Sequence, residues 1–301
     1  MATERHLTRW NKEDAGRTGY WGPSTSSIDW CEANYEHTQY IAECFNTVSN
    51  VAFVALACYG IFRAIEQKLP RRFAAGHAAV ALIGVGSALF HMTLQYSWQL
   101  GDELPMIYAS AFITWIVFDT KPINSPLNLA IPFGLLAFNI FFTVAYLTFP
   151  NPVYHEVTYG FLVVATTARG AYLLFTRLQD HPLNREVRRL QFWGSASFLL
   201  AFAIWNWDNL ACNRFVTPWK AAIGAPWSWV LEGHAWWHIF TGLGCYSVIV
   251  AMCALTLAIR DSPDHFELRY TLRFIAWVSR TPEGWQALED AKPSERRPLL
   301  N

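Results

Sequence analysis

Long apolar runs constrain this chain more than any other feature of its sequence. A helix needs ~20 mostly apolar residues to cross the hydrocarbon core of a bilayer. The 301 residues contain seven such runs, and only 15% of the residues are charged, whereas soluble domains carry about 25%. The runs cover roughly residues 45–65, 73–94, 99–118, 127–149, 153–175, 191–211 and 228–259. We therefore predict an all-α membrane protein, a seven-transmembrane helix bundle.

The connections between these runs are short and polar, which favours antiparallel neighbours in one bundle. We expect a non-cytosolic segment at residues 1–44, a membrane domain at 45–259 and a flexible cytosolic tail at 260–301. Lys and Arg collect in the loops after the first, third and fifth runs, so the positive-inside rule predicts a cytosolic C-terminus and an N-terminus on the opposite side. The net charge is zero and no basic stripe is present, so nothing indicates nucleic-acid binding.

Polar residues within the apolar runs show a bias toward one side. Because the runs alternate in direction, the end of an even-numbered run and the start of an odd-numbered run meet the same membrane face. Polar residues scattered for packing alone would show no such bias, and ionisable groups inside a membrane are costly unless they have a function. The residues of this predicted layer are His91, Asp102, His155, Asp208, His234 and His238.

The histidines of this layer predict a metal centre. His234 and His238 are four residues apart, so they share one helix face and can bind one ion. With His91 as a third ligand, the set matches catalytic zinc sites, in which the open position holds a water that acts as the nucleophile in hydrolysis. Asp102 could take and return its proton, and Ser87, one turn before His91, could donate to a developing oxyanion. A site within a bilayer indicates a lipid substrate.

Oxygen ligands cluster before the first apolar run. Asp29, Glu32 and Asn34 fall within six residues, and Glu43 lies just before the run. Such a set could bind Ca²⁺, although its spacing is not that of an EF-hand loop. An acidic segment in this place is also explained by helix capping and solvated charge, so both interpretations stay open.

Two other classes of function are compatible with the apolar runs. A seven-transmembrane lipid receptor of the progestin and adiponectin receptor type would use zinc as a structural ion. A long cytosolic coupling segment would favour that alternative, and the tail after residue 260 is short. A transporter is disfavoured because no internal repeat is evident.

The combined pattern Ser87-x3-His91-x10-Asp102 and His234-x3-His238 resembles the superfamily that joins alkaline ceramidases to the progestin and adiponectin receptors. The surrounding segments are most similar to alkaline ceramidases, including the fungal phytoceramidase and dihydroceramidase branch, over roughly residues 19–260. Those segments are Gly19-Tyr20-Trp21-Gly22-Pro23, Asp29-Trp30-Cys31-Glu32, Phe90-His91-Met92-Thr93-Leu94, Asp102-Glu103-Leu104-Pro105-Met106, Trp205-Asn206-Trp207-Asp208-Asn209 and His234-Ala235-Trp236-Trp237-His238.

The resemblance implies an intramembrane zinc-dependent amidase that cleaves ceramide, dihydroceramide or phytoceramide into a sphingoid base and a fatty acid. It implies an endoplasmic reticulum or Golgi membrane, with a lumenal N-terminus and no obligate protein partner. The residues matching its functional positions are His91, His234 and His238 for zinc, Ser87 and Asp102 for catalysis, Asp29, Trp30 through its carbonyl, Glu32, Asn34 and Glu43 for calcium, and Tyr159 and Trp237 near the sphingoid headgroup.

The cysteines divide between the two sides of the predicted topology. Cys31 and Cys212 both fall on the non-cytosolic side, where disulfides persist. We therefore expect a bridge between them. The other four cysteines lie in or beside the apolar runs and are more typical of packing residues.

Overall fold

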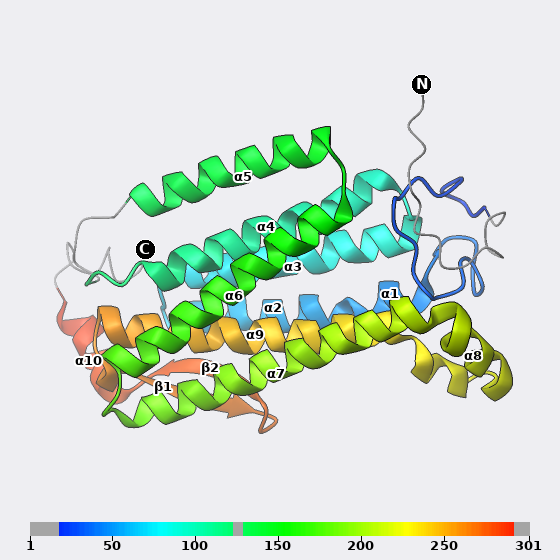
Figure 1. The fold of residues 1–301 in the computed structure, drawn as a ribbon. Helices are drawn as coiled ribbons and strands as arrows, with labels where there is room; N and C mark the ends of the chain where they lie inside the picture. The colour runs from blue at the N-terminus through cyan, green and yellow to red at the C-terminus, as the bar shows by residue number, and fades with distance from the viewer. Residues whose placement is uncertain (1–17, 123–128, 292–301) are drawn as a thin grey trace. The chain divides into compact units, whose positions relative to one another are not determined.

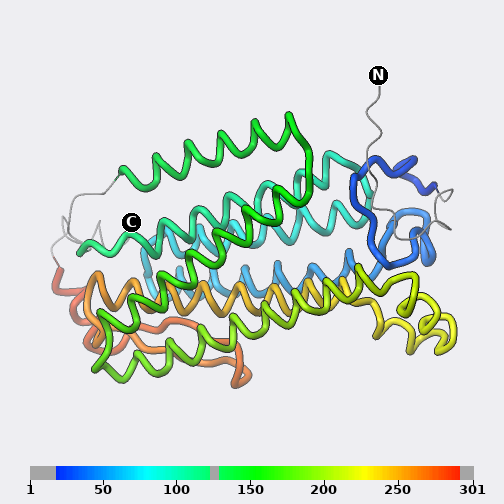
Figure 2. Tube along the Cα trace, viewed as in Figure 1, coloured from blue at the N-terminus to red at the C-terminus, as the bar shows by residue number. Residues whose placement is uncertain are grey.

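The structure is a computed structural model that describes residues 18–122 and 129–291. Apart from one β-hairpin near its end, the regular structure in these residues is helical (Figures 1 and 2). The elements are α1 (Cys44–Ser49), α2 (Val51–Glu66), α3 (Arg71–Thr93), α4 (Tyr96–Phe118), α5 (Ala130–Thr148), α6 (Pro152–Arg177), α7 (Pro182–Ala211), η2 (Cys212–Val216), α8 (Thr217–Ile223), η3 (Trp227–Leu231), α9 (Gly233–Arg260), η4 (Pro263–His265), β1 (Phe266–Thr271), β2 (Ile275–Arg280) and α10 (Pro282–Asp290).

Each predicted apolar run falls on a helix, and five helical segments are long and apolar enough to cross a membrane. The runs at 99–118 and 191–211 lie on α4 and α7. These two helices are not among the five segments, because their polar residues make them less apolar. Residues 127 and 128, which begin the fourth predicted run, lie outside the described residues. The five segments are Cys44–Glu66, Arg71–Thr93, Ala130–Thr148, Pro152–Arg177 and Gly233–Arg260.

The chain forms two compact units, and it passes between them within α2, α3, α4, α7 and α9. The first unit comprises Met1–Ala55, Leu82–Pro105 and Ser197–Leu243. The second comprises Leu56–Ala81, Met106–Ala196 and Gly244–Asn301. All three histidines of the predicted zinc set, Ser87 and Asp102 belong to the first unit.

Glycines bring α3 and α4 together in the first unit. A Cβ atom placed on Gly86 would lie 2.0 Å from the carbonyl oxygen of Gly101, a distance that no real side chain tolerates. The two backbones can approach this closely only because Gly86 has no side chain at the contact. Ser87 and Asp102 directly follow these two glycines, so the contact also fixes the spacing of the two predicted catalytic residues.

Backbone hydrogen bonds hold the N-terminal segment against the end of α3. The amides of Ala42 and Glu43 donate to the carbonyls of Met92 and His91 at 2.9 and 3.0 Å. This pairing aligns Glu43 with His91 before α1 begins. The N-terminal segment is the blue loop in Figure 2.

A disulfide joins Cys31 in the N-terminal segment to Cys212 at the start of η2, with the two Cα atoms 5.5 Å apart. It is the pairing that the sequence predicts. Beside it, Lys220 of α8 donates from Nζ to the Cys31 carbonyl at 3.2 Å and to a Glu232 carboxylate oxygen at 2.7 Å. The α8 segment is thereby attached to the N-terminal segment through a covalent bond and a half-buried cation.

The second unit contains a buried ionic cluster. Arg72 of α3 donates to the Asp119 carboxylate at 2.9 Å, and Arg260 of α9 contacts the same carboxylate and the Asp119 carbonyl. One acidic residue thus links the start of α3, the end of α4 and the end of α9.

The C-terminal tail corrects one expectation. Where the sequence predicted a flexible extension from residue 260, β1 and β2 form an antiparallel hairpin with Phe266 opposite Arg280 and Thr271 opposite Ile275. Alternate hairpin side chains such as Leu268 and Val278 are buried, so the segment has an apolar side of its own. Alternation over only six residues in each strand is too short to predict the hairpin from the sequence. Residues 292–301 of the predicted tail lie outside the described residues.

Contacts with α2 and the α2–α3 connection hold the hairpin in place. Arg280 donates to the carbonyls of Gln67 and Lys68 at 3.0 and 3.2 Å. The guanidinium of Arg63 lies 4.1 Å from the centre of the Trp277 ring. These contacts replace the solvated tail that the sequence suggested.

Candidate metal centre

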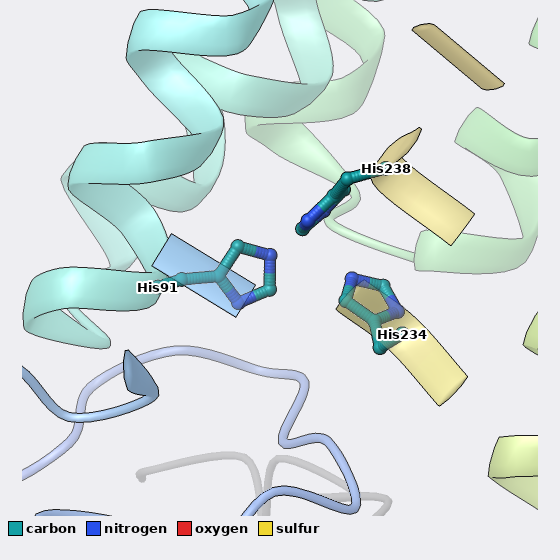
Figure 3. A group of neighbouring side chains, drawn as sticks. All are labelled: His91, His234 and His238. Carbon is teal, nitrogen blue, oxygen red and sulfur yellow. The ribbon is translucent and has the colours of Figure 1, made fainter. Parts of the chain in front are cut away.

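Three buried histidines meet in the first unit. His91 lies near the end of α3, and His234 and His238 occupy the first two turns of α9. Their ligand nitrogens all lie within 4.8 Å of one another, and each residue is at most 4% exposed (Figure 3). The three side chains could therefore hold one metal ion.

Two ring nitrogens in this group have no hydrogen-bond partner among the described residues. They are Nε2 of His91 and Nδ1 of His234, both fully buried. A buried polar atom without a partner costs about 1–3 kcal/mol. A metal ion bound to His91 Nε2 would remove that cost there, so the residues fit a metal centre.

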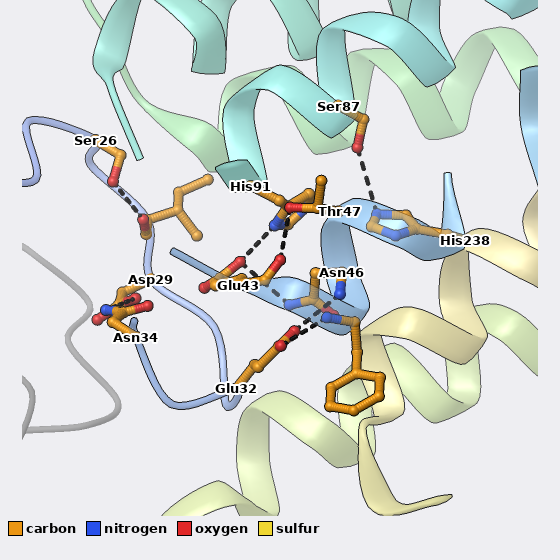
Figure 4. A network of polar contacts seen from close by, with 12 residues as sticks. Ser26, Asp29, Glu32, Asn34, Glu43, Asn46, Thr47, Ser87, His91 and His238 are labelled. Atoms are coloured by element: carbon orange, nitrogen blue, oxygen red, sulfur yellow. Dashed lines mark hydrogen bonds and ion pairs between the residues drawn. The ribbon is translucent and has the colours of Figure 1, made fainter. Parts of the chain in front are cut away.

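The other nitrogen of His91 is held by a carboxylate. His91 Nδ1 lies 2.5 Å from Glu43 Oε2, and Asn46 Nδ2 donates to the same oxygen at 3.2 Å (Figure 4). Metal-binding histidines commonly donate their second N–H to a carboxylate, which fixes the ring and strengthens the ligand. This contact leaves Nε2 of His91 free for the metal ion.

His238 is oriented by the first helix. Its Nδ1 lies 2.8 Å from Ser49 Oγ and 3.3 Å from Asn50 Nδ2. Ser49 ends α1 and Asn50 separates α1 from α2, so the break between these helices faces the histidine. With Nδ1 engaged, Nε2 of His238 points to the centre of the group.

His234 is held by an aromatic ring and by the start of its helix. The Trp30 ring stacks on His234 with centroids 3.8 Å apart and an interplanar angle of 21°. The Asp208 carboxylate accepts from the Gly233 amide at 3.2 Å, so Asp208 caps the first turn of α9. From the sequence, Asp208 was assigned only to the predicted polar layer. In the structure Asp208 caps α9 at Gly233, the residue that precedes His234.

Ser87 and Asp102 lie beside the histidines. Ser87 Oγ is 3.4 Å from His238 Nε2, and Ser87 also hydrogen-bonds to the Asp102 carboxylate. A hydroxyl, a carboxylate and three imidazoles therefore converge from α3, α4 and α9. Such a set can position a water molecule, hold its proton and donate a hydrogen bond to a developing negative charge.

Glu32 caps the first helix. Its two carboxylate oxygens accept from the amides of Phe45 and Asn46 at 2.7 and 2.8 Å. Burial raises the pKa of Glu32 to about 7, and the nearby Glu232 carboxylate adds to this effect. The capping interpretation of the acidic segment thus applies to Glu32.

The other predicted calcium ligands lie near one another in the same segment. Asn34 Nδ2 donates to Asp29 Oδ1 at 3.2 Å, and the Trp30 amide donates to the Glu43 carboxylate. Burial and the nearby carboxylates of Asp29 and Glu32 hold the pKa of Glu43 well above its usual range. Glu43 Oε1 is buried with no hydrogen-bond partner among the described residues. Three clustered carboxylates and this unpaired oxygen are compatible with a hard cation.

The ligand atoms of the acidic group are less closely gathered than those of the histidine group. In the described part of the chain, only the three histidines form a set of three or more His, Cys, Asp or Glu ligand atoms lying this close together. Binding calcium would therefore require the carboxylates to draw closer than they are in this structure.

Aromatic side chains continue from the site along α7 and α9. Trp237 packs against Phe198 and Trp205, with ring centroids 5.7 and 6.1 Å apart. Trp205 in turn contacts Trp30, whose ring stacks on His234. Trp237 is therefore part of an aromatic wall with Phe198 and Trp205, two residues to which the sequence assigned no role of their own.

Tyr159 and His155 belong to the second unit. They lie on α6, and their rings stack with centroids 6.2 Å apart. The alternation of apolar runs assigned His155 to the same layer as the three histidines. His155 belongs to the second unit, whereas the three histidines belong to the first. The headgroup role of Tyr159 stays a prediction.

Ser49 and Asn50 are the main site residues whose function the sequence did not predict. Polar residues in an apolar run are usually explained by hydrogen bonds between helices, and here both contact His238 of α9. Their one available signal is position: with Asn46 they give the start of the first apolar run a polar side, directly after Glu43.

Comparison with known proteins shows the family of this sequence. The Ceramidase family model matches residues 22–281. Alkaline ceramidase 3 of Mus musculus is 36% identical over 248 residues, which cover 82% of this chain and 90% of that protein. Alkaline ceramidase YPC1 of Saccharomyces cerevisiae is 32% identical over 299 residues, covering 94% of each chain. Alkaline ceramidase of Arabidopsis thaliana is 30% identical, covering 77% and 84%.

Proposed function

Because this chain belongs to the alkaline ceramidase family of hydrolases, we propose that it cleaves the N-acyl bond of ceramide-type lipids to a sphingoid base and a free fatty acid. The observation that carries the proposal is the group of three buried histidines, whose ligand nitrogens all lie within 4.8 Å of one another. Apolar helices of membrane-spanning length support a substrate that enters from the bilayer.

We propose that the metal is zinc, held by His91, His234 and His238. Imidazole nitrogens are typical zinc ligands, and three of them leave one position open. When bound, zinc would supply the Lewis acid that activates a water molecule for attack on the amide carbonyl. Glu43 and Ser49 would keep two of the imidazoles in the orientation that binding requires.

Two further side chains would carry the proton and the developing charge. Asp102 would accept the proton of the attacking water on its carboxylate and return it to the departing amine. Ser87 would donate its hydroxyl hydrogen to the carbonyl oxygen as negative charge develops there. The contacts of Ser87 with both His238 and Asp102 support this division of roles.

We also propose a calcium site at Asp29, the Trp30 carbonyl, Glu32, Asn34 and Glu43. Clustered buried carboxylates support it, since a bound cation would offset their mutual repulsion. The test is calcium-dependent thermal stability of the purified protein. Wild-type protein should be stabilised by Ca²⁺ and Glu32→Ala should respond less. An equal response in both, or none in either, would remove the site from the proposal.

The headgroup of the substrate would contact Trp237 of the first unit, and the resemblance to alkaline ceramidases also assigns a headgroup role to Tyr159 of the second unit. The aromatic wall of Phe198, Trp205 and Trp237 supports an amphipathic ligand beside the histidines. We further propose seven membrane spans, with α4 and α7 completing the five apolar helices, a lumenal N-terminus and a membrane of the endoplasmic reticulum or Golgi.

Fatty-acid release from ceramide in liposomes tests the function. Zinc-loaded wild-type protein should turn over ceramide, and His238→Ala should reduce turnover by at least about 10³-fold, because loss of a ligand removes the activated water. His265→Ala, outside the histidine group, is the control and should retain turnover. Ceramide binding without product formation would instead favour a lipid receptor with a structural metal.

A further inference from the structure

A groove of about 1110 Å³ lies between the end of α6 and the start of α7. It is formed within the second unit, and none of its lining residues belongs to the histidine centre or the acidic segment. The ceramide chemistry proposed above does not use it.

Three arginines line this groove within five residues of α7: Arg185, Arg188 and Arg189. All three are exposed, and none forms an ion pair with a carboxylate in the described part of the chain. The groove also contains Asp180 and Glu186, so three positive and two negative charges leave a net charge of +1. The groove is therefore suited to an anion.

A neighbouring histidine is already engaged. His181 also lines the groove, but its Nε2 lies 3.1 Å from an Asp264 carboxylate oxygen. The arginines are therefore the groups available to a ligand.

The apolar part of the groove indicates what kind of anion it suits. The Arg188 guanidinium lies 5.1 Å from the centre of the Phe175 ring. Phe175 is 54% exposed and Phe192 is 64% exposed, and both line the groove. Neighbouring Trp193 is 62% exposed. A ligand lying in this groove would contact guanidinium groups with one part of its structure and aromatic rings with another.

The groove adjoins a helix of membrane-spanning length. α6 carries exposed apolar residues along its length, including Phe161, Val164 and Tyr172. An acyl chain could follow such a surface from a headgroup held by the arginines. A small soluble anion would use the charges but would leave the aromatic surface uncovered.

We propose that this groove binds the phosphate headgroup of an anionic membrane phospholipid. Arg185 and Arg189 contact the phosphate, because guanidinium groups pair with phosphate oxygens through two parallel hydrogen bonds. Arg188, held over Phe175, adds charge at the edge of the aromatic surface on which the acyl chains lie. The site is separate from the catalytic function and does not depend on it.

Lipid retention measured by native mass spectrometry tests the site. Purified full-length protein is incubated with equal amounts of dioleoyl phosphatidic acid and dioleoyl phosphatidylcholine, which share acyl chains and differ in headgroup. The wild-type protein should retain phosphatidic acid preferentially. Arg185→Gln/Arg189→Gln should lower that preference by about tenfold or more, because each basic residue contributes roughly a factor of five near an anionic lipid.

The matched control is Arg177→Gln. Arg177 is an exposed arginine at the end of α6 that does not line the groove, so this variant should keep the wild-type preference. Equal retention of the two lipids by wild-type protein, or an unchanged preference in the double variant, would overturn the proposal.

A competition arm separates a lipid from free phosphate. Inorganic phosphate should displace phosphatidic acid only weakly, because it lacks the acyl chains that cover Phe175 and Phe192. Displacement at equal concentrations would show a simple phosphate site and would overturn the lipid assignment.

Discussion

Nδ1 of His91 lies 2.5 Å from a carboxylate oxygen of Glu43. The two residues come from different segments, and the backbone pairing of Glu43 with His91 brings them together. Glu43 also belongs to the acidic segment proposed to bind calcium. One carboxylate therefore adjoins both proposed metal sites.

Glu43→Gln should weaken metal binding at the histidines by about 10- to 100-fold, the usual effect of losing a carboxylate behind a histidine ligand. Zinc affinity measured by chelator competition checks this. Because Glu43 is also in the proposed calcium set, the measurement is made at fixed saturating calcium and again without it. Glu36→Gln, an exposed change in the same segment, should leave zinc affinity unchanged. Wild-type affinity in Glu43→Gln would contradict the positioning role.

Gly86→Ala should separate α3 from α4, because its methyl group would lie 2.0 Å from the Gly101 carbonyl oxygen. Overpacking of this kind costs about 1–3 kcal/mol. We expect a lower melting temperature and a loss of ceramide turnover beyond that explained by unfolding, since Ser87 and Asp102 would move apart. Gly134→Ala in α5 is the control, because nothing lies within 4 Å of its added Cβ. A fully active Gly86→Ala protein would show that the spacing is not critical.

Lys220→Met should destabilise the protein by about 3–5 kcal/mol at most, because it leaves the buried Glu232 carboxylate without its cation. Glu232→Gln/Lys220→Met should cost less than the sum of the two single changes, since both remove the same pair. Thermal unfolding of all four proteins completes the cycle. Strict additivity would mean that the ion pair contributes nothing.

Arg280→Ala should detach the C-terminal hairpin from the α2–α3 connection. Arg280 is only 4% exposed and donates to two carbonyls, and hydrogen bonds from a charged group contribute about 1.5–3 kcal/mol each. We expect a lower melting temperature and faster proteolysis after residue 260. Arg269→Ala, an exposed change in β1, should shift stability by no more than ~0.5 kcal/mol. Equal stability of the two variants would rule out a holding role for Arg280.

Much of the candidate site was accessible from sequence because its ligands obey simple periodicities. The i, i+4 spacing places His234 and His238 on one helix face, and alternation of apolar runs brings His91 to the same level. The resemblance to alkaline ceramidases, carried by the same residues, is confirmed by the family match. Alternation of apolar runs predicts only a level along the membrane normal, and it does not predict which side chains His155 contacts, among them the rings of Tyr146 and Tyr159.

The contacts that orient the ligands were less accessible. Whether Ser49 or another polar residue of the first helix faces His238 depends on the rotation of that helix about its axis, which no spacing within one helix determines. The hairpin was missed for a different reason. Its buried positions include Leu268 and Val278. They lie in strands of only six residues, so the alternation of apolar and polar side chains is too short to stand out in a segment that also contains charged residues.

The Cys31–Cys212 bridge makes completion of the first unit a late event in biosynthesis. The two cysteines are 181 positions apart, so at about 5–20 residues per second the ribosome needs roughly ten seconds or more between them. Through that interval the Cys31 thiol and the neighbouring carboxylates have no α8 segment to pack against. Any disulfide that Cys31 forms in that interval has to be undone by thiol–disulfide exchange before the native bridge can close.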